Sequence, residues 1–114
     1  MPNFPYSQAL TANQLGFDPL TNWQFRQVPL QYLNGAAVSV LVRATTTGVR
    51  LTVYSGTTTI QQRAPVQGGG TAGTTPSVLN TTPITFIANP GDFLLLQHDE
   101  VAGGTPTVDG VVQI

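Results

Sequence analysis

The sequence contains no lysine, and this absence excludes several kinds of chemistry. All four of its basic residues are arginine. A Walker A phosphate loop, a Schiff-base enzyme and a lysine general base each require an ammonium group, so the chain belongs to none of these classes. Four scattered arginines beside five acidic residues also argue against direct nucleic-acid binding, which needs several basic contacts to phosphates.

Cysteine is missing as well, and charge of either sign is scarce. Without cysteine, disulfides and cysteine-based metal sites are excluded. Charged residues make up 8% of the chain, against about 25% in an ordinary domain. A free surface this poor in charge is a solubility risk, so we expect much of the surface to contact other proteins. Disorder is disfavoured, because 40% of the residues are hydrophobic and the net charge is only -1.

Long apolar runs are the third absence. No run approaches the roughly 18 residues that span a bilayer, and the start MPNFPYSQAL has neither the basic nor the apolar region of a signal peptide. We therefore expect neither a membrane partner nor a cleaved signal. The 114 residues are expected to form an extended N-terminal arm at 1–21 and a single β-sandwich domain at 22–114.

What the sequence does contain is a series of short segments in which apolar and polar residues alternate. This period of two predicts β-strands. The segments are NWQFR, VPLQYL, AAVSVLVRA, VRLTVYS, TTTIQQR, ITFIA, FLLLQHD and VDGVVQI. About eight short strands without a convincing helix predict an all-β, two-sheet antiparallel sandwich. The jelly roll is the preferred arrangement, and an immunoglobulin-like sandwich is the alternative.

Turn-forming residues between these segments predict how the strands connect. TTTG and Ser55-Gly56 join three consecutive strands into a meander, and Asn89-Pro90-Gly91-Asp92 joins two later strands as a hairpin. Gly110 indicates a bulge in the last strand. Residues 64–83 form a long uncharged Gly/Thr/Pro loop, which we expect at a contact or on the outer surface.

Histidine occurs once, as His98 beside Asp99 and Glu100. On a strand, His98 and Glu100 share one face and Asp99 points to the other, so the three groups do not converge on a metal. No serine lies in a nucleophile elbow. We predict a protein without catalytic residues, in which the QHDE segment is a polar strand end, with a subunit or ligand contact as the alternative.

No cofactor or metal is expected, although two patterns were weighed. Gly68, Gly70 and Gly73 match the letters of a dinucleotide-binding fingerprint, but Pro76 prevents the helix that this motif requires, so a flexible loop is the better interpretation. Acidic residues towards the C-terminus leave a calcium site between loops as an open alternative. These residues are Asp92, Asp99, Glu100 and Asp109.

Aromatic residues and arginines are the expected interface residues. Arginine is more weakly hydrated than lysine, stacks on aromatic rings and is favoured at interfaces, although compositional bias in the source genome would also explain the missing lysines. The candidates are Phe4, Tyr6, Phe17, Trp23, Arg43, Arg50, Tyr54 and Arg63. A sugar-stacking platform of Trp23, Tyr32 and Tyr54 is the alternative use of the aromatic rings.

An aromatic, proline-broken beginning, Thr/Val-rich strands and long uncharged loops together resemble small virion proteins of phages and other viruses. In particular, the chain is similar to single jelly-roll coat proteins and small capsid-decorating β proteins. The resemblance implies a structural protein of the virion that binds copies of itself or other capsid proteins. Many such coat proteins have a basic N-terminal arm, which this chain lacks, so genome contact would fall to another protein. A non-catalytic glycan- or receptor-binding module is the alternative.

Overall fold

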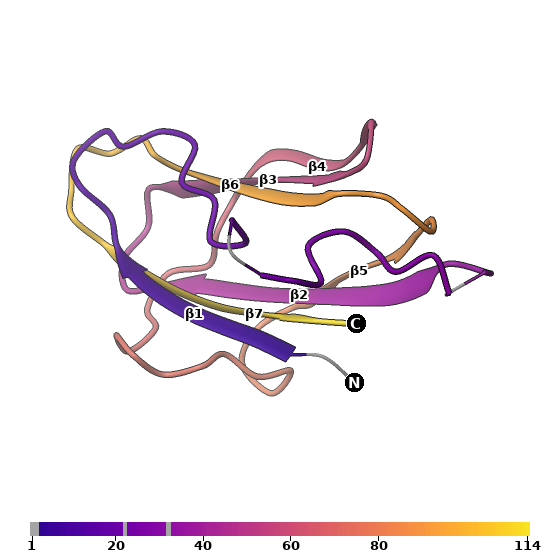
Figure 1. Ribbon diagram of the computed structural model, residues 1–114. Coiled ribbons are helices and arrows are strands. Elements are labelled where there is room, and N and C mark those ends of the chain that lie inside the picture. The colour runs from indigo at the N-terminus through magenta and orange to yellow at the C-terminus, as the bar shows by residue number, and fades with distance from the viewer. Residues whose placement is uncertain (1–2, 22, 32) are drawn as a thin grey trace.

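The computed structural model describes residues 3–21, 23–31 and 33–114, and it shows two antiparallel sheets packed face to face (Figure 1). The first sheet has the strand order β1-β7-β2-β5, and the second has the order β4-β3-β6. No helix occurs within the described ranges, so none of their segments could cross a membrane as a helix. The predicted two-sheet antiparallel sandwich is confirmed.

Period-two alternation accounts for the later strands and for the core. Val38, Val40 and Val42 alternate with outward residues on β2, and their side chains are at most 7% exposed. Val49, Leu51 and Val53 do the same on β3. The strands are β1 (Asn3–Ala9), β2 (Ala36–Ala44), β3 (Val49–Ser55), β4 (Thr58–Pro65), β5 (Ile84–Ala88), β6 (Leu94–Glu100) and β7 (Thr107–Gln113).

The predicted strands NWQFR and VPLQYL are wrong. Residues 23–31 instead contain turns, in which the Trp23 N–H donates to Leu20 O and the Arg26 N–H to Trp23 O. Alternation arises here because Trp23, Phe25 and Val28 anchor a surface segment to the core at intervals. Asn22 and Tyr32 lie outside the described residues.

Two predicted connections are also wrong, although their turns form. β2 lies in the first sheet and β3 in the second, so residues 45–48 cross between the sheets and the three-stranded meander does not form. Its second half is confirmed, because β3 and β4 pair across the Ser55-Gly56 turn. The 89–92 turn forms, with the Asp92 N–H donating to Asn89 O over 3.1 Å, but it joins β5 and β6, which lie in different sheets. Turn residues fix a local reversal, and the partner of each strand is fixed by tertiary packing.

The beginning of the chain belongs to the sandwich. Residues 3–9 of the expected N-terminal arm form edge strand β1, which pairs with β7 from Asn3 opposite Gln113 to Ala9 opposite Thr107. The predicted bulge at Gly110 is wrong, because Gly110 pairs in regular register with Tyr6 and Val42. A Cβ on Gly110 would collide with the ring of Tyr6, so glycine is needed here to leave room for that ring.

The long connection between β4 and β5 lies under the first sheet (Figure 1). It is hydrogen-bonded to β2, since the Gly70 N–H donates to Ala44 O over 2.9 Å and Arg43 Nη1 donates to Asn80 O over 2.8 Å. Leu41 and Val111 face outward on this side and are nevertheless only 4% and 5% exposed. The connection therefore packs on the outer face of the first sheet.

Candidate functional site

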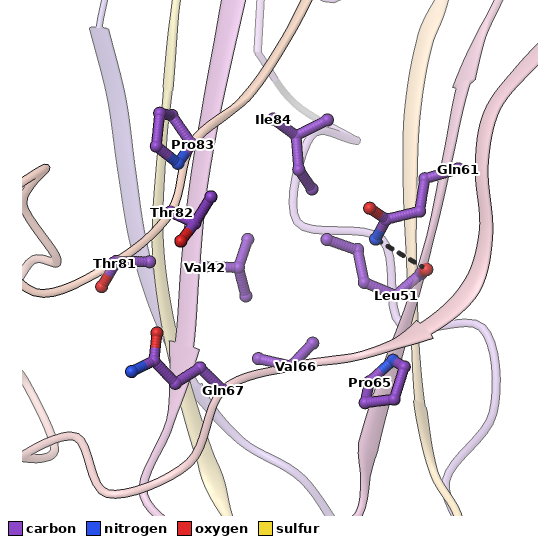
Figure 2. Close-up of a pocket in the computed structure, with 10 residues that line it drawn as sticks. All are labelled: Val42, Leu51, Gln61, Pro65, Val66, Gln67, Thr81, Thr82, Pro83 and Ile84. Atoms are coloured by element: carbon purple, nitrogen blue, oxygen red, sulfur yellow. Dashed lines mark hydrogen bonds between the residues drawn. The ribbon is translucent and has the colours of Figure 1, made fainter.

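A pocket of about 490 Å³ opens between the two sheets, beside the edge strands β4 and β5 (Figure 2). Val42 of β2 and Leu51 of β3 point into it from opposite sheets. Gln61 lies at its rim and donates from Nε2 to Leu51 O over 3.4 Å. Its other lining residues are Pro65, Val66, Gln67, Thr81, Thr82, Pro83 and Ile84.

The chemistry of this between-sheet pocket suits contact and not reaction. Its floor is aliphatic, and its polar groups are two glutamine amides and two threonine hydroxyls. None of the lining residues is charged, so the lining contains no carboxylate, imidazole or ammonium group that could act as a general acid or base. It can bury an uncharged, largely apolar group.

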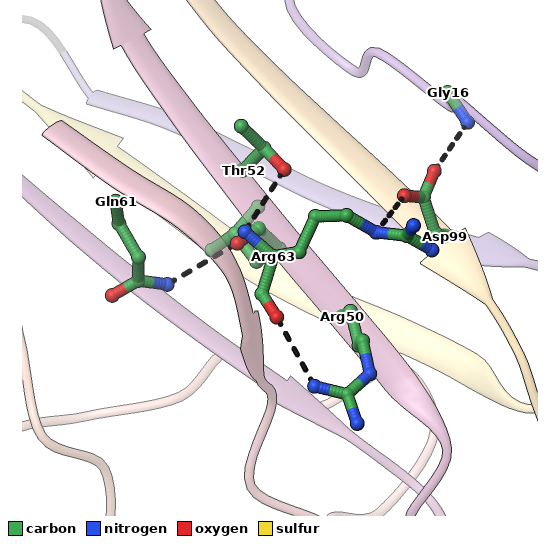
Figure 3. Close-up of polar contacts among 7 residues, drawn as sticks. Gly16, Arg50, Thr52, Gln61, Arg63 and Asp99 are labelled. Atoms are coloured by element: carbon green, nitrogen blue, oxygen red, sulfur yellow. Dashed lines mark hydrogen bonds and ion pairs between the residues drawn. The ribbon is translucent and has the colours of Figure 1, made fainter. Parts of the chain in front are cut away.

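Arg50 and Arg63 lie on the outer face of the second sheet, where their hydrogen bonds stay within the chain (Figure 3). Arg63 Nε forms an ion pair with Asp99 Oδ2 over 3.2 Å, and Asp99 Oδ1 accepts from the Gly16 N–H over 2.8 Å. Arg50 Nη1 donates to Arg63 O. The Arg63 N–H donates to Thr52 Oγ1 at an irregular point of the β3–β4 pairing. These arginines thus support the β4 edge, while half-buried Tyr54 lies further along β3.

His98 lies on β6 and is fully buried against Tyr6 of β1 and Phe17. Its Nδ1 lies 3.1 Å from Phe17 O, and its Nε2 lies 2.8 Å from the Tyr6 hydroxyl. A carbonyl oxygen only accepts, so the ring proton is on Nδ1 and Nε2 accepts from the phenol. Burial lowers the pKa of His98 to about 4 and raises the pKa of Tyr6 well above its ordinary value. This neutral pair is a core contact, and the polar strand end is therefore buried.

Glu100 is also buried, and it binds backbone amides. Its carboxylate accepts from the N–H groups of Asn13, Ala102 and Gly103 over 2.7 to 3.0 Å. The hydrogen bond from Asn13 is the main cause of its lowered pKa, followed in the same direction by those from Ala102 and Gly103. His98 and Glu100 share the inner face of β6, as predicted, and Asp99 faces outward.

Arg43 and Asp109 meet in a second, polar pocket of about 190 Å³ under the long connection. They stand directly opposite each other on β2 and β7. Asp109 is 3% exposed and accepts from the Gly73 N–H on Oδ1 over 3.1 Å. The sequence analysis named Arg43 as an interface candidate and Asp109 as a possible calcium ligand, and it did not place them together, because only the pairing of β2 with β7 brings the two residues opposite each other. Threonines and Asn80 of the connection complete the lining.

Four of the five aromatic interface candidates pack against other rings within the chain. The Phe4 and Trp23 rings lie 5.3 Å apart, while Tyr6 and Phe17 flank His98 with ring centroids 5.5 and 5.6 Å away. Trp23 therefore sits against β1, and Tyr54 lies on the outer side of β3, so these two rings do not form a shared sugar platform. Tyr32, the third member, is outside the described residues.

The four acidic residues considered as calcium ligands contact different groups at separate positions. Asp92 accepts from Ser55 and Asn89, and the other three lie at the separate positions described above. Within residues 3–21, 23–31 and 33–114, no group of three or more histidine, cysteine or acidic side chains is placed to hold a metal ion.

Comparison with known proteins gave no relative on which a function could rest. The sequence matches no protein-family model and no curated protein, and the fold matches no solved structure.

Proposed function

We propose that this chain is a non-enzymatic structural subunit of a virion, either a coat protein or a capsid-decorating protein with a jelly-roll fold. The supporting observation is the nested order of its strand pairs. A jelly roll is an antiparallel ribbon wound around a barrel, in which the first of eight strands pairs with the last, the second with the seventh and so on inward.

The pairs of this chain follow that order once a short segment before β2 is included. β1 pairs with β7, β2 with β5, and β3 with β4. The missing pair lies beside β6, where Phe17 bridges His98 in antiparallel fashion and the Glu100 N–H donates to Gln14 O over 2.8 Å. We take residues 14–17 as the counterpart of the second strand, and these two contacts support that assignment. Capsid subunits are among the proteins built on this fold.

Exposed apolar side chains support a role in assembly. Segments 26–31 and 33–35 lie beside segment 87–94 at one end of the sandwich, and hydrogen bonds join Val28 to the 91–92 turn (Figure 1). Leu30, Leu33, Ile87 and Phe93 of these segments are 56% to 83% exposed, and we call them the apolar end. Large apolar side chains on a surface with little charge are typical of protein contacts.

The first prediction concerns assembly. We expect the purified chain to form oligomers or particles, or to bind capsids, and we expect Leu33→Glu and Ile87→Glu to weaken that association because a carboxylate would be desolvated there. Native mass spectrometry and electron microscopy measure the outcome. Thr105→Glu is the control, since Thr105 is an exposed polar residue of the loop between β6 and β7 and is not part of the apolar end. A monomer at high concentration that binds no capsid contradicts the proposal.

A further inference from the structure

Arg43 and Asp109 both line the second pocket, but they do not form an ion pair with each other. Among the described residues, the ion pairs within 4 Å are Arg26–Asp18 and Arg63–Asp99. Arg43 uses Nη1 on Asn80 O, while its Nε is buried without a hydrogen-bond partner. A buried charged donor that lacks a partner is costly. In the part of the chain that the structure describes, no hydrogen bond is made by Arg43 Nη2 or accepted by Asp109 Oδ2, so the pocket has hydrogen-bonding capacity that the chain itself does not use.

The balance of charge decides which ligands fit. An anion would be attracted by Arg43 and repelled by the buried Asp109 carboxylate, and a cation would meet the reverse problem. A neutral ligand that offers donors and acceptors side by side suits both groups. Hydroxyl groups have this property, because each donates one hydrogen bond and accepts others. Neighbouring hydroxyls of a sugar can thus accept from Arg43 and donate to Asp109.

The size and rigidity of the pocket agree with a ligand of this kind. A volume of about 190 Å³ corresponds to about six waters, which is the space of a single sugar ring. Thr71, Thr74 and Thr75 add hydroxyls to the lining. The connection lies close against β2, since a Cβ on Gly68 would come within 2.9 Å of the Thr46–Thr47 backbone. The Gly69 and Gly70 N–H groups also donate to Thr45 O and Ala44 O, so backbone hydrogen bonds hold this part of the lining against β2, which limits the entropy lost on binding.

We propose that the Arg43–Asp109 pocket is a binding site for a neutral monosaccharide unit, free or at the end of a glycan. The site is separate from Trp23 and Tyr54 and does not depend on the virion proposal, because either a capsid subunit or a monomeric module can carry it. Specificity comes from paired hydrogen bonds to adjacent hydroxyls and not from stacking on an aromatic ring.

Titration of the isotope-labelled full chain with glucose, galactose and mannose, followed by amide NMR shifts, tests this proposal. We expect at least one sugar to shift the amides of Gly69, Gly70, Thr74 and Asn80 with a millimolar dissociation constant. Arg43→Met keeps the side-chain length and removes the donors, and Asp109→Asn keeps an acceptor for the Gly73 N–H. Each change should weaken binding about tenfold, as expected for one charged hydrogen bond.

Arg50→Met is the matched control, because it removes an arginine from the other sheet and should leave the sugar affinity unchanged. Inorganic phosphate is the competing probe. The proposal is overturned if no sugar shifts these amides in the wild-type chain, if phosphate shifts them more strongly than any sugar, or if Arg43→Met and Asp109→Asn bind as the wild type does. The wild-type titration decides the question even if a variant fails to fold.

Discussion

Gly110 is important because it has no Cβ, and the Tyr6 ring occupies the space where a Cβ would lie. The Tyr6 ring lies over it, with ring atom Cε1 2.7 Å from the place where a Cβ would stand. Both positions belong to regularly paired strands, so neither backbone has a loop that could move aside. Tyr6 and Gly110 therefore act as one unit, and the ring is held where its hydroxyl reaches His98.

We predict that Gly110→Ala destabilises the chain by about 1 to 3 kcal/mol, the usual cost of forcing an extra carbon into a packed site. Urea unfolding measures the change. In a double-mutant cycle, Gly110→Ala should cost much less in a Tyr6→Ala background, where the ring no longer occupies the site. Additive losses would show that the two residues do not compete for this space.

The buried histidine predicts how stability depends on pH. Its pKa is about 4 in the folded chain, against an ordinary value of 6.5. Below pH 6.5 the histidine is protonated in the unfolded chain, whereas in the folded chain it stays neutral down to about pH 4. The free energy of unfolding therefore falls as the pH falls. The loss should reach about 3 kcal/mol between pH 6.5 and 4 and then level off for this group.

Thermal unfolding at a series of pH values checks this prediction. His98→Gln keeps a donor and an acceptor but does not titrate, so its stability should be nearly flat from pH 6.5 to 4.5. Acid unfolding at still lower pH should remain, because the lowered pKa of Glu100 means that its stabilising charge is lost only as the pH falls through that value. An unchanged slope in His98→Gln would assign the pH dependence to other groups.

At the scale of elements, β1 has a different role from the one expected of an arm. It covers the edge of β7 and brings two half-buried aromatic residues, Phe4 and Tyr6, against the core. Its exposed positions carry small or polar side chains, as in Ser7 and Gln8. This strand therefore contributes to the fold of its own chain.

We predict that deleting residues 3–9 prevents cooperative folding, because it removes two aromatic contacts and leaves the β7 edge unpaired. Circular dichroism and thermal melting measure the effect. Ser7→Ala and Gln8→Ala, at exposed positions of the same strand, are the controls and should change stability by less than about 0.5 kcal/mol. A deletion mutant that folds normally and only fails to assemble would restore the interpretation as an arm.

The positions of most strands could be predicted from the sequence, but the pairing of the strands into sheets could not. Alternation of Val38, Val40 and Val42 fixed the inward face of β2, since only one face of that strand packs on the second sheet. The same alternation around Trp23 was misleading, because a segment with turns can also anchor apolar side chains at intervals. NFPYSQA was missed because Pro5 disfavours a central strand, although an edge strand tolerates it.

The candidate sites were less predictable for the same reason. Arg43 stood out by its residue type, but Asp109 is 66 positions away in the sequence, and only the register of β2 with β7 places them opposite each other. The long connection was recognisable as a loop from its glycines and threonines. Its position under the first sheet depends on hydrogen bonds to β2 that no local sequence pattern predicts.

At the scale of the whole molecule, the structure shows what the four arginine side chains contact. Arg26 and Arg63 are paired with Asp18 and Asp99, and Arg43 and Arg50 donate to backbone carbonyls of the same chain. Each arginine therefore makes at least one polar contact within the chain, and the apolar end has little electrostatic protection against association. Assembly through the apolar end should depend weakly on salt.

The pairing of β1 with β7 also determines how the molecule would carry a mechanical load. Asn3 lies opposite Gln113, so both ends of the described chain leave the first sheet at the same side. A force pulling the two ends apart would act across the hydrogen bonds between β1 and β7 and break them one after another, as a zipper opens. The sandwich would thus yield from its termini at low force, whereas a load applied through its faces would be shared by many contacts at once.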